Sequence, residues 1–514
     1  MKIYFSFLAL VAFATAIKEH EHPNFPRQHK IKALEEEQTT EFWKDKAQNI
    51  LAHKLQTLNE LNTRRAKNVI LFLGDGMSVH TVTATRAFMG DSSKQVYFEK
   101  FPYLGLSRTY SVDKRTPDSA TTATAYLNGV KANYGTIGVN AQVPRTDCLK
   151  ANDSSTHTES LAKWAQDAGK WAGLVTTARV THASPAGVYA HVADREWEYD
   201  GAILDDKCNT ETNTDIARQL VEWPVGKELR VILGGGRRNF RDKSMNDEEG
   251  SAGYRRDKRD LIEEWLATKR AENKSAQYVW SKKGLEMVDL EKTEYLLGLF
   301  SASHCPYHGD LKRDRLEQAD PSLSLMTEAA IKMLSKHDKG YFLFVEGARI
   351  DMAHHDSRAH KSLEDTEEFA RAVELARNMT SEEDTLIVVT SDHSHTMTIN
   401  GYPNRGANIF NLAPSLADDG LPYTVLSYAN GPGFSNTFSS SKGRKDLSLN
   451  DVQDPKYKFM ATIPLSSETH GADDVGVFAS GPYAHYFTGN YEQSNIPALM
   501  AHIANMGPFA DDKL

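Results

Sequence analysis

Several features that mark particular protein classes are scarce in this sequence. Only three of its 514 residues are cysteine, no apolar run after the N-terminus reaches the roughly 18 residues that cross a bilayer, and no long basic run or internal repeat occurs. With 40% hydrophobic and 25% charged residues, the composition excludes a disordered, collagenous or multi-span membrane protein. The net charge is −9, so a nucleic acid polymer is not expected as the main partner, because binding the phosphate backbone requires a positive surface.

The first residues have the pattern of a secretory signal. Lys2 precedes an apolar run at residues 3–13, and Ala14-Thr15-Ala16 matches a small-residue cleavage site. We therefore expect residues 1–16 to be a signal peptide and the mature protein to be secreted and extracellular; the alternative is an uncleaved N-terminal anchor. Residues 506–514 are polar and lack the apolar tail of a lipid-anchor signal, so neither a transmembrane nor a lipid anchor is expected.

An extracellular location gives meaning to the cysteines and to the Asn-x-Ser/Thr sequons. Cys148 and Cys208 flank a compact region and could pair, which leaves Cys305 as a free thiol or an intermolecular link. Three sequons are candidate glycan acceptors on surface loops. Their asparagines are Asn152, Asn273 and Asn378.

Short apolar runs alternate with helical patterns through most of the chain. Runs of this length suit strands that are buried on both faces of a parallel sheet. Their alternation with helices predicts an α/β fold with a central, mostly parallel sheet flanked by helices. The expected strands are residues 68–73, 171–176, 230–233, 341–345, 385–390 and 475–479.

Two segments stand outside this alternation. Residues 17–62 begin as a polar arm and continue as an amphipathic pattern that predicts a helix at 40–61. Residues 401–465 are rich in glycine, proline, serine and asparagine, and we expect an inserted, crown-like surface subdomain there; the alternative is a long irregular loop, which is uncommon in a compact domain. The catalytic domain then comprises residues 63–400 and 466–514.

Acids and histidines follow three of the expected strands. Asp75 follows the first, Glu346 follows the fourth with Asp351 and His355 soon after, and Ser391-Asp392-His393-Ser394-His395 follows the fifth. Ligands of open α/β sheets bind outside the carboxyl ends of the strands. A single such aspartate would more often cap a helix, but mixed carboxylate and imidazole ligands suit zinc with an open position. The clusters together therefore predict a catalytic metal site.

Ser119 is the candidate nucleophile. Pro117 and the Ala/Thr-rich stretch that follows predict a helix that starts near Ser119, where the helix dipole favours phosphate. A plain helix cap is the alternative for this segment alone. Because no Ser-His-Asp spacing is apparent, a metal would have to activate the hydroxyl.

Several motifs resemble the signatures of animal alkaline phosphatases, and they occur in the order of that family. The likeness runs from about residue 41 to residue 482. It implies a metal-dependent enzyme that hydrolyses small phosphate monoesters with broad specificity and an alkaline pH optimum, and that forms a homodimer. The motifs are Asn68-Val-Ile-Leu-Phe-Leu-Gly-Asp-Gly-Met77, Pro117-Asp-Ser-Ala120, His182-Ala-Ser184, Val345-Glu-Gly-Ala-Arg-Ile-Asp351, Ser391-Asp-His-Ser-His395 and Glu468-Thr-His470.

The resemblance also implies a role for each site residue. Ser119 would form a phosphoserine intermediate, Arg195 would hold the phosphate, and His182 would lie near a magnesium ion. Cys148 and Cys208 match a family disulfide. The expected metals are two Zn²⁺ and one Mg²⁺ per subunit: the first zinc on Asp351, His355 and His470, the second on Asp75, Asp392 and His393, and the magnesium on Asp75, Ser184 and Glu346.

The chain departs from the family pattern at several places, two of which bear on ligand binding. Glu249, Phe300 and Asp320 align with part of a calcium site, but Ser301 stands where a further glutamate belongs, which weakens the expectation of bound Ca²⁺. Met352 replaces the histidine that vertebrate members usually carry beside a zinc ligand. A thioether is only a weak hydrogen-bond acceptor, so phosphate is expected to bind less tightly.

Two other functions compete with a phosphomonoesterase. A nucleotide pyrophosphatase or phosphodiesterase of the same superfamily would typically use threonine as nucleophile and lack the magnesium residues. A secreted binding protein that kept the fold without the chemistry would lack a ligand or the nucleophile. Ser119 and all eight metal-site side chains are present, which favours the phosphomonoesterase.

Overall fold

The computed structural model describes residues 35–59, 61–316, 318–439, 441 and 443–511. The expected signal peptide and most of the polar arm lie outside these residues, so both stay predictions. Within the described ranges, no helix is both long enough and apolar enough to cross a membrane.

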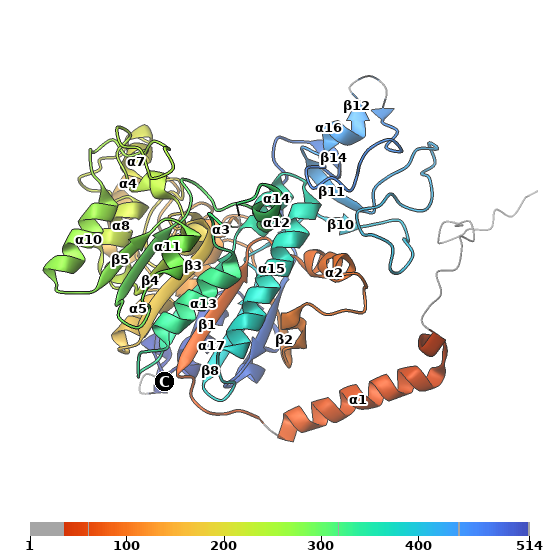
Figure 1. The fold of residues 1–514 in the computed structure, drawn as a ribbon, viewed down its shortest axis with the longest axis horizontal. Coiled ribbons are helices and arrows are strands. Elements are labelled where there is room, and N and C mark those ends of the chain that lie inside the picture. Colours follow the sequence, from red (N-terminus) through yellow and green to blue (C-terminus); the bar gives the residue numbers. More distant parts are fainter. Residues whose placement is uncertain (1–34, 60, 317, 440, 442, 512–514) are drawn as a thin grey trace, which may run out of the picture.

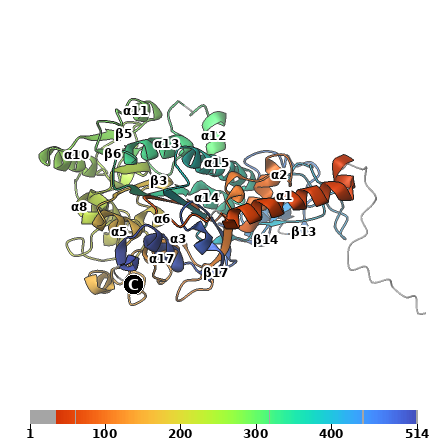
Figure 2. The ribbon, with the colours of Figure 1, turned by 90° about the horizontal axis from the view of Figure 1, so that it is seen from below.

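A ten-stranded sheet runs through the centre of the molecule, and helices cover both of its faces (Figures 1 and 2). The strand order across the sheet is β17-β2-β16-β8-β1-β7-β3-β4-β6-β5. The strands are β1 (Asn68–Gly74), β2 (Tyr103–Arg108), β3 (Trp171–Arg179), β4 (Val231–Gly235), β5 (Ala276–Val279), β6 (Tyr295–Leu299), β7 (Tyr341–Gly347), β8 (Thr385–Thr390), β16 (Val475–Ser480) and β17 (Gly489–Glu492).

The middle of this sheet is parallel and buried on both faces, as the sequence predicts. β1 pairs in parallel with β7 on one side and with β8 on the other. Along β1, Val69 and Leu71 pack into one apolar layer, whereas Ile70 and Phe72 pack into the layer on the opposite face. Strands of this kind need apolar residues at every position, because successive side chains point to opposite faces.

The helices form the two outer layers. On one face, α13 and α15 pack with α2 and α14 in a single apolar cluster; on the other face, α3, α5, α6 and α17 share the second cluster. The helices are α1 (Thr40–Asn59), α2 (Val79–Phe88), α3 (Ser119–Asn128), α4 (Cys148–Ala151), α5 (Leu161–Asp167), α6 (Ala183–Ala186), α7 (Asp200–Asp205), α8 (Ile216–Glu222), α9 (Pro224–Lys227), α10 (Leu261–Ala271), α11 (Lys282–Glu286), α12 (His308–Arg313), α13 (Leu323–Leu334), α14 (Arg349–His355), α15 (Ala359–Asn378), α16 (Phe434–Thr437) and α17 (Asn495–Ile503).

The sheet corrects one expectation about its edge. The run at 475–479 forms β16, but this strand is antiparallel to β8 and to β2 rather than part of the parallel set. β2 and β17 lie beyond it, and the sequence patterns did not predict them. Burial along β2 alternates, which is typical of a strand with one covered face.

The segment at 401–465 contains short strands instead of one irregular loop. β11 (Leu426–Gly431) and β14 (Met460–Pro464) form a small sheet with β10 (Thr398–Ile399), which lies just before the segment, and β12 (Phe438–Ser439) pairs with β13 (Gly443–Arg444). This region lies beside the sheet's helical layer, at the upper right of Figure 1, around its own apolar cluster. The domain boundaries themselves stay predictions.

Helix α1 lies apart from the sheet, below the body in Figure 1. It begins at Thr40, where the sequence predicts a helix start, and Lys54 reaches the carbonyl of Pro102 with an Nζ–O distance of 3.3 Å. Apolar side chains on this helix are exposed to solvent. They include Trp43, Ile50, Leu51 and Leu55.

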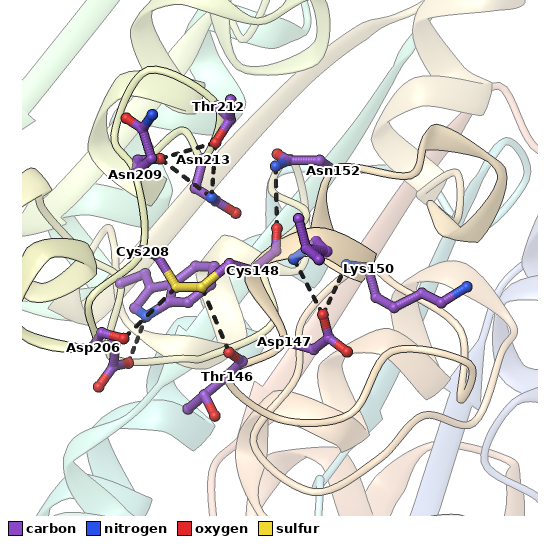
Figure 3. Close-up of a disulfide and its surroundings, with 12 residues drawn as sticks. Thr146, Asp147, Cys148, Lys150, Asn152, Asp206, Cys208, Asn209, Thr212 and Asn213 are labelled. Atoms are coloured by element: carbon purple, nitrogen blue, oxygen red, sulfur yellow. Dashed lines mark hydrogen bonds between the residues drawn. A yellow bond between two sulfur atoms is a disulfide. The ribbon is translucent and has the colours of Figure 1, made fainter.

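A disulfide joins Cys148 and Cys208, whose Cα atoms are 5.6 Å apart (Figure 3). This confirms the pairing implied by the resemblance. Cys305 is free and buried, so an intermolecular link through its thiol would require local opening. The three sequon asparagines are exposed, and their glycosylation stays a prediction.

Candidate active site

The acids and histidines singled out by the sequence meet at the carboxyl end of the parallel strands. Asp75 directly follows β1, Glu346 is the second-last residue of β7, and Asp392 and His393 follow β8. The helix after β7 is α14, which adds Asp351 and His355 one turn apart. His470 arrives from far along the chain because β15 (His470–Gly471) pairs antiparallel with β9 (Ser394–His395).

Ser119 is the first residue of α3, as predicted. Asp118 caps this helix by accepting a hydrogen bond from the backbone N–H of Thr121 at 3.3 Å. Ser119 is almost fully buried, and its Oγ lies 3.3 Å from Nε2 of His393. The hydroxyl therefore lies at the positive end of a helix dipole and beside the acid–histidine cluster.

Asp351, His355 and His470 form one compact group. Oδ1 of Asp351 lies 3.4 Å from Nε2 of each histidine, and the two Nε2 atoms are 3.0 Å apart. Each histidine has its Nδ1 at a backbone carbonyl, that of Glu468 for His355 and that of Pro117 for His470. Nδ1–H donation to a carbonyl leaves the Nε2 lone pair free, which is the usual arrangement of a metal-binding histidine.

The pKa values of this group also favour the protonation states that bind metal. Burial lowers the pKa of both His355 and His470, so each ring stays neutral at ordinary pH. Burial by itself would raise the pKa of Asp351, but the surrounding imidazoles hold the pKa of this carboxyl well below its usual range. Neutral imidazole and ionised carboxylate are the forms that bind metal.

Asp75, Asp392 and His393 form a second compact group. Nε2 of His393 lies 3.0 Å from Oδ2 of Asp392 and 3.7 Å from Oδ1 of Asp75. The other oxygen of Asp392 accepts a hydrogen bond from the N–H of Gly76 at 2.9 Å. The three side chains are fully buried, and their ligand atoms lie close enough together to share one ion.

Asp75, Ser184 and Glu346 are notable for buried oxygens that have no hydrogen-bond partner. Both carboxylate oxygens of Asp75, Oγ of Ser184 and Oε1 of Glu346 are in this state. Burial raises the pKa of Asp75 well above its usual range and that of Glu346 to about 7. Buried polar atoms are normally paired, so unpaired oxygens from three residues fit a hard cation that prefers oxygen ligands.

Arg195 contacts both the residue that caps α3 and His182. Nη1 of Arg195 lies 2.9 Å from Oδ2 of Asp118, the residue before Ser119, and Nη2 lies 3.3 Å from Nε2 of His182. Burial lowers the pKa of His182 to about 3, and the neighbouring arginines act in the same direction. The guanidinium of Arg195, oriented by Asp118 and next to the neutral His182, can bind an anion.

Two residues of the site were not assigned from the sequence. Nε2 of His395 lies 2.7 Å from Oδ1 of Asp351, and Nδ1 of His395 contacts the carboxylate of Glu468. Glu468 also accepts from the N–H of Thr396 at 2.8 Å. Both residues stand in motifs that the sequence analysis quoted, next to assigned ligands. Their mutual contact depends on the β9–β15 pairing, which the sequence did not predict.

One of the residues aligned with a calcium site contacts a cation of the chain itself. The buried guanidinium of Arg237 contacts the carboxylate of Glu249 and lies 3.0 Å from the Leu299 carbonyl. Asp320 has Oγ of Ser301 at 3.5 Å from its Oδ1. One expected carboxylate is thus paired with arginine and another is replaced by serine. These side chains do not form a complete calcium ligand set.

Comparison with known proteins shows the family to which the sequence belongs. The alkaline phosphatase family profile matches residues 66–506. The chain belongs to the alkaline phosphatase family. It is 45% identical over 450 residues to a protein named membrane-bound alkaline phosphatase from Bombyx mori, covering 86% of this chain and 81% of the relative. It is 44% identical over 490 residues to the tissue-nonspecific isozyme of alkaline phosphatase from Gallus gallus, covering 92% and 91%.

Solved structures give the same result for the fold of this alkaline phosphatase. The enzyme from the Antarctic bacterium TAB5 has a TM-score of 0.58 at 22% identity, covering 87% of this chain and 99% of that one. The enzyme from Thermus thermophilus has a TM-score of 0.59 at 23% identity, covering 86% and 92%. The family is metal-dependent, and the phosphatase presents several clusters of side chains able to hold metal ions.

Proposed function

We propose that this protein is a secreted phosphomonoesterase that transfers a phosphoryl group to Ser119 and then to water. Its substrates are small phosphate monoesters, with broad specificity and an alkaline pH optimum. The observation that carries the proposal is the position of the Ser119 hydroxyl, which is buried at the start of α3 and lies 3.3 Å from Nε2 of His393.

We assign two zinc ions and one magnesium ion to the three groups described above. Mixed carboxylate and imidazole ligands suit zinc, and the oxygen-only set of Asp75, Ser184 and Glu346 suits magnesium. The unpartnered oxygens of that set support the assignment. When bound, the zinc ions supply Lewis-acid stabilisation of the attacking and leaving oxygens.

The protein's own residues then have separate tasks. Oγ of Ser119 gives its proton to solvent and attacks phosphorus, the bond from phosphorus to the leaving oxygen breaks, and the products are a phosphoserine and an alkoxide that takes up a proton from water. A water molecule attacks the phosphoserine in the second step and releases inorganic phosphate and the free serine. Arg195 can donate two N–H groups to phosphate oxygens, which a lysine could not reproduce, while Asp118 holds the guanidinium at 2.9 Å.

The covalent step is tested with Ser119→Ala. We expect this variant to form no phosphoenzyme and to lose several orders of magnitude in turnover, because it lacks the oxygen that would accept the phosphoryl group. Acid quenching with labelled phosphate measures the intermediate. Ser155→Ala, an exposed serine in the loop before α5, is the matched control and should label normally. Label that persists on Ser119→Ala contradicts the assignment.

Chelation tests the metal requirement. Turnover of p-nitrophenyl phosphate should fall to background after dialysis against a chelator and should return with Zn²⁺ and Mg²⁺ together, but only in part with either alone. Elemental analysis of the restored enzyme should give two zinc and one magnesium per chain. A chelated protein that keeps full activity would contradict the assignment, and one with phosphodiesterase activity but no phosphomonoesterase activity would favour the competing function.

We also propose secretion and a homodimer. The signal-like segment and the Cys148–Cys208 disulfide support passage through an oxidising compartment. The silkworm relative is named membrane-bound, so fractionation of producing cells into medium and membrane is the direct test. Activity that sediments with membranes and resists release by high salt would overturn the secreted assignment.

A further inference from the structure

A cavity lies at the far end of α3 from Ser119. Its volume is about 310 Å³, and it is bounded by the last residue of α3, by the start of α5 and by the junction of α8 with α9. α3 has 10 residues, so this cavity is roughly 15 Å from the serine along the helix. None of the proposed metal ligands lines it.

One side of the cavity is a stack of aromatic rings. The rings of His157 and His191 are parallel within 4°, with centroids 4.5 Å apart. Trp223 lies against the same pair, 5.8 Å from His191 at 30° and 6.1 Å from His157 at 28°. Aromatic rings prefer offset stacking or edge contact with another ring, so this aromatic group favours a flat partner.

Asn128, which lines the cavity, has a buried hydrogen-bond acceptor without a partner. Asn128 is 4% exposed, and its Oδ1 has no partner. The amide orientation is set by Thr158, because Nδ2 donates to both the carbonyl and the hydroxyl of Thr158 at 3.0 Å, and the reversed amide would place two oxygens together. A buried acceptor without a partner is destabilising, so this oxygen favours a ligand with an N–H donor.

The charges around the cavity disfavour an anion. Lys163 is the one lysine or arginine among the described residues that line it, and its ammonium is paired with Asp167. Glu159 accepts a hydrogen bond from Nε1 of Trp164 at 3.1 Å. Burial lowers the pKa of His191 to about 4, so this ring is neutral at ordinary pH. A second phosphate would find no free cation here.

We propose that this cavity binds a flat, uncharged nitrogen heterocycle, which stacks on the His157–His191–Trp223 wall and donates an N–H to Oδ1 of Asn128. The ligand is neither substrate nor product of the phosphatase reaction, because its site lacks the metal ligands, the serine and the arginine. α3 connects the two sites, since Asn128 ends the helix that Ser119 begins.

The test uses indole and 1-methylindole on the metal-loaded enzyme. The two probes have the same ring system, but only indole has an N–H. We expect indole to bind with one site per chain and about fivefold more tightly, the effect of one net hydrogen bond. Saturating inorganic phosphate should leave this binding unchanged. Equal affinities, absent binding or displacement by phosphate would each overturn the proposal.

Two variants with matched controls locate the site. Trp223→Leu should weaken both probes at least fivefold, whereas Trp280→Leu, at a half-exposed tryptophan elsewhere, should not. Asn128→Ala should abolish the preference for indole. Thr158→Val removes the side-chain bond to Asn128 but leaves Oδ1 in place, so it should keep the preference. Unchanged turnover of p-nitrophenyl phosphate verifies that each variant folds. If Asn128→Ala does not fold, the comparison of indole with 1-methylindole on the unaltered enzyme still tests the proposal.

Discussion

Met352 places a sulfur atom beside a proposed zinc ligand. The side chain is half-buried, and its Sδ lies 2.9 Å from Nη1 of Arg349. Met352 is therefore neither fully buried nor without a polar neighbour. A thioether accepts hydrogen bonds weakly and donates none, so it adds little to the binding of phosphate or of its waters.

Replacing this residue by histidine should strengthen phosphate binding. We expect Met352→His to lower the phosphate inhibition constant about fivefold, the effect of one net hydrogen bond of ~1 kcal/mol. If release of phosphate limits turnover, kcat should fall as well. Met352→Leu, which is similar in size and cannot hydrogen-bond, is the control. Inhibition constants that match in all three proteins at equal pH and saturating metals would refute this role.

Single residues were predictable from the sequence where they follow a strand. Asp75 and Asp392 were found because a carboxylate directly after a buried run is a recognisable signal. His395 was quoted in its motif but received no role, because its contact with Asp351 and Glu468 joins parts of the chain 44 and 73 residues away. Likewise, Arg237 beside Glu249 could not be foreseen, since neither residue type by itself indicates a buried pair.

Among the helices, α15 contains a buried acid whose ionisation lowers the stability of the folded protein at high pH. Asp365 is buried where α15 meets α12 and accepts a hydrogen bond from the N–H of His308 at 3.1 Å. Burial raises its pKa to about 8, and Glu364 and Glu368 act in the same direction, whereas Arg349 acts against them. In the unfolded chain an aspartate ionises near pH 3.9.

This difference predicts a pH-dependent gain from Asp365→Asn. Because the folded-state pKa is the higher one, ionisation favours the unfolded chain, and stability is lost as pH rises from about 4 to about 8. The variant should match the parent protein near pH 4 and melt at a higher temperature near pH 9. Thermal denaturation across this range measures it, with the exposed Asp418→Asn as control. A melting difference that stays constant with pH would count against the prediction.

Strands in the middle of the sheet were more predictable than those at its edge. β1, β7 and β8 are continuous apolar runs, because both faces are covered. β2 alternates between buried and exposed residues, so a search for apolar runs does not find it. The antiparallel direction of β16 relative to β2 does not follow from such a search either. β6 is fully buried and offered the same signal as the central strands, but it was overlooked.

At the scale of the whole molecule, α1 leaves apolar surface without cover. Ile50, Leu51 and Leu55 are each more than half exposed, and Trp43 is half exposed. On a helix these positions lie along one side. The 3₁₀ turn before α1 contacts the 401–465 region, where Glu37 pairs with Arg405. A second copy of the chain is the occupant that the resemblance implies for this surface.

Charged residues on that side of α1 should therefore separate the subunits. We expect the unaltered protein to have twice the mass of one chain by light scattering at micromolar concentration. The triple variant Ile50→Glu, Leu51→Glu, Leu55→Glu should have the mass of one chain, because burying three carboxylates is unfavourable. Asn49→Glu, on the other side of the helix, should remain a dimer. A monomeric unaltered protein would contradict the homodimer.

The distribution of the site along the chain has a consequence for the order of events during synthesis. Asp75 and His470 converge on the same edge of the sheet, yet nearly the whole polypeptide separates them. At translation rates of 5–20 residues per second, roughly 20 to 80 seconds pass between their appearances. Until His470 emerges, the ligand set of the first zinc is incomplete, whereas the proposed magnesium set is complete once Glu346 has appeared and the second zinc set once His393 has appeared. The first zinc should therefore be the last metal to bind, and the supply of zinc in the compartment where folding ends should decide how much of the protein becomes active.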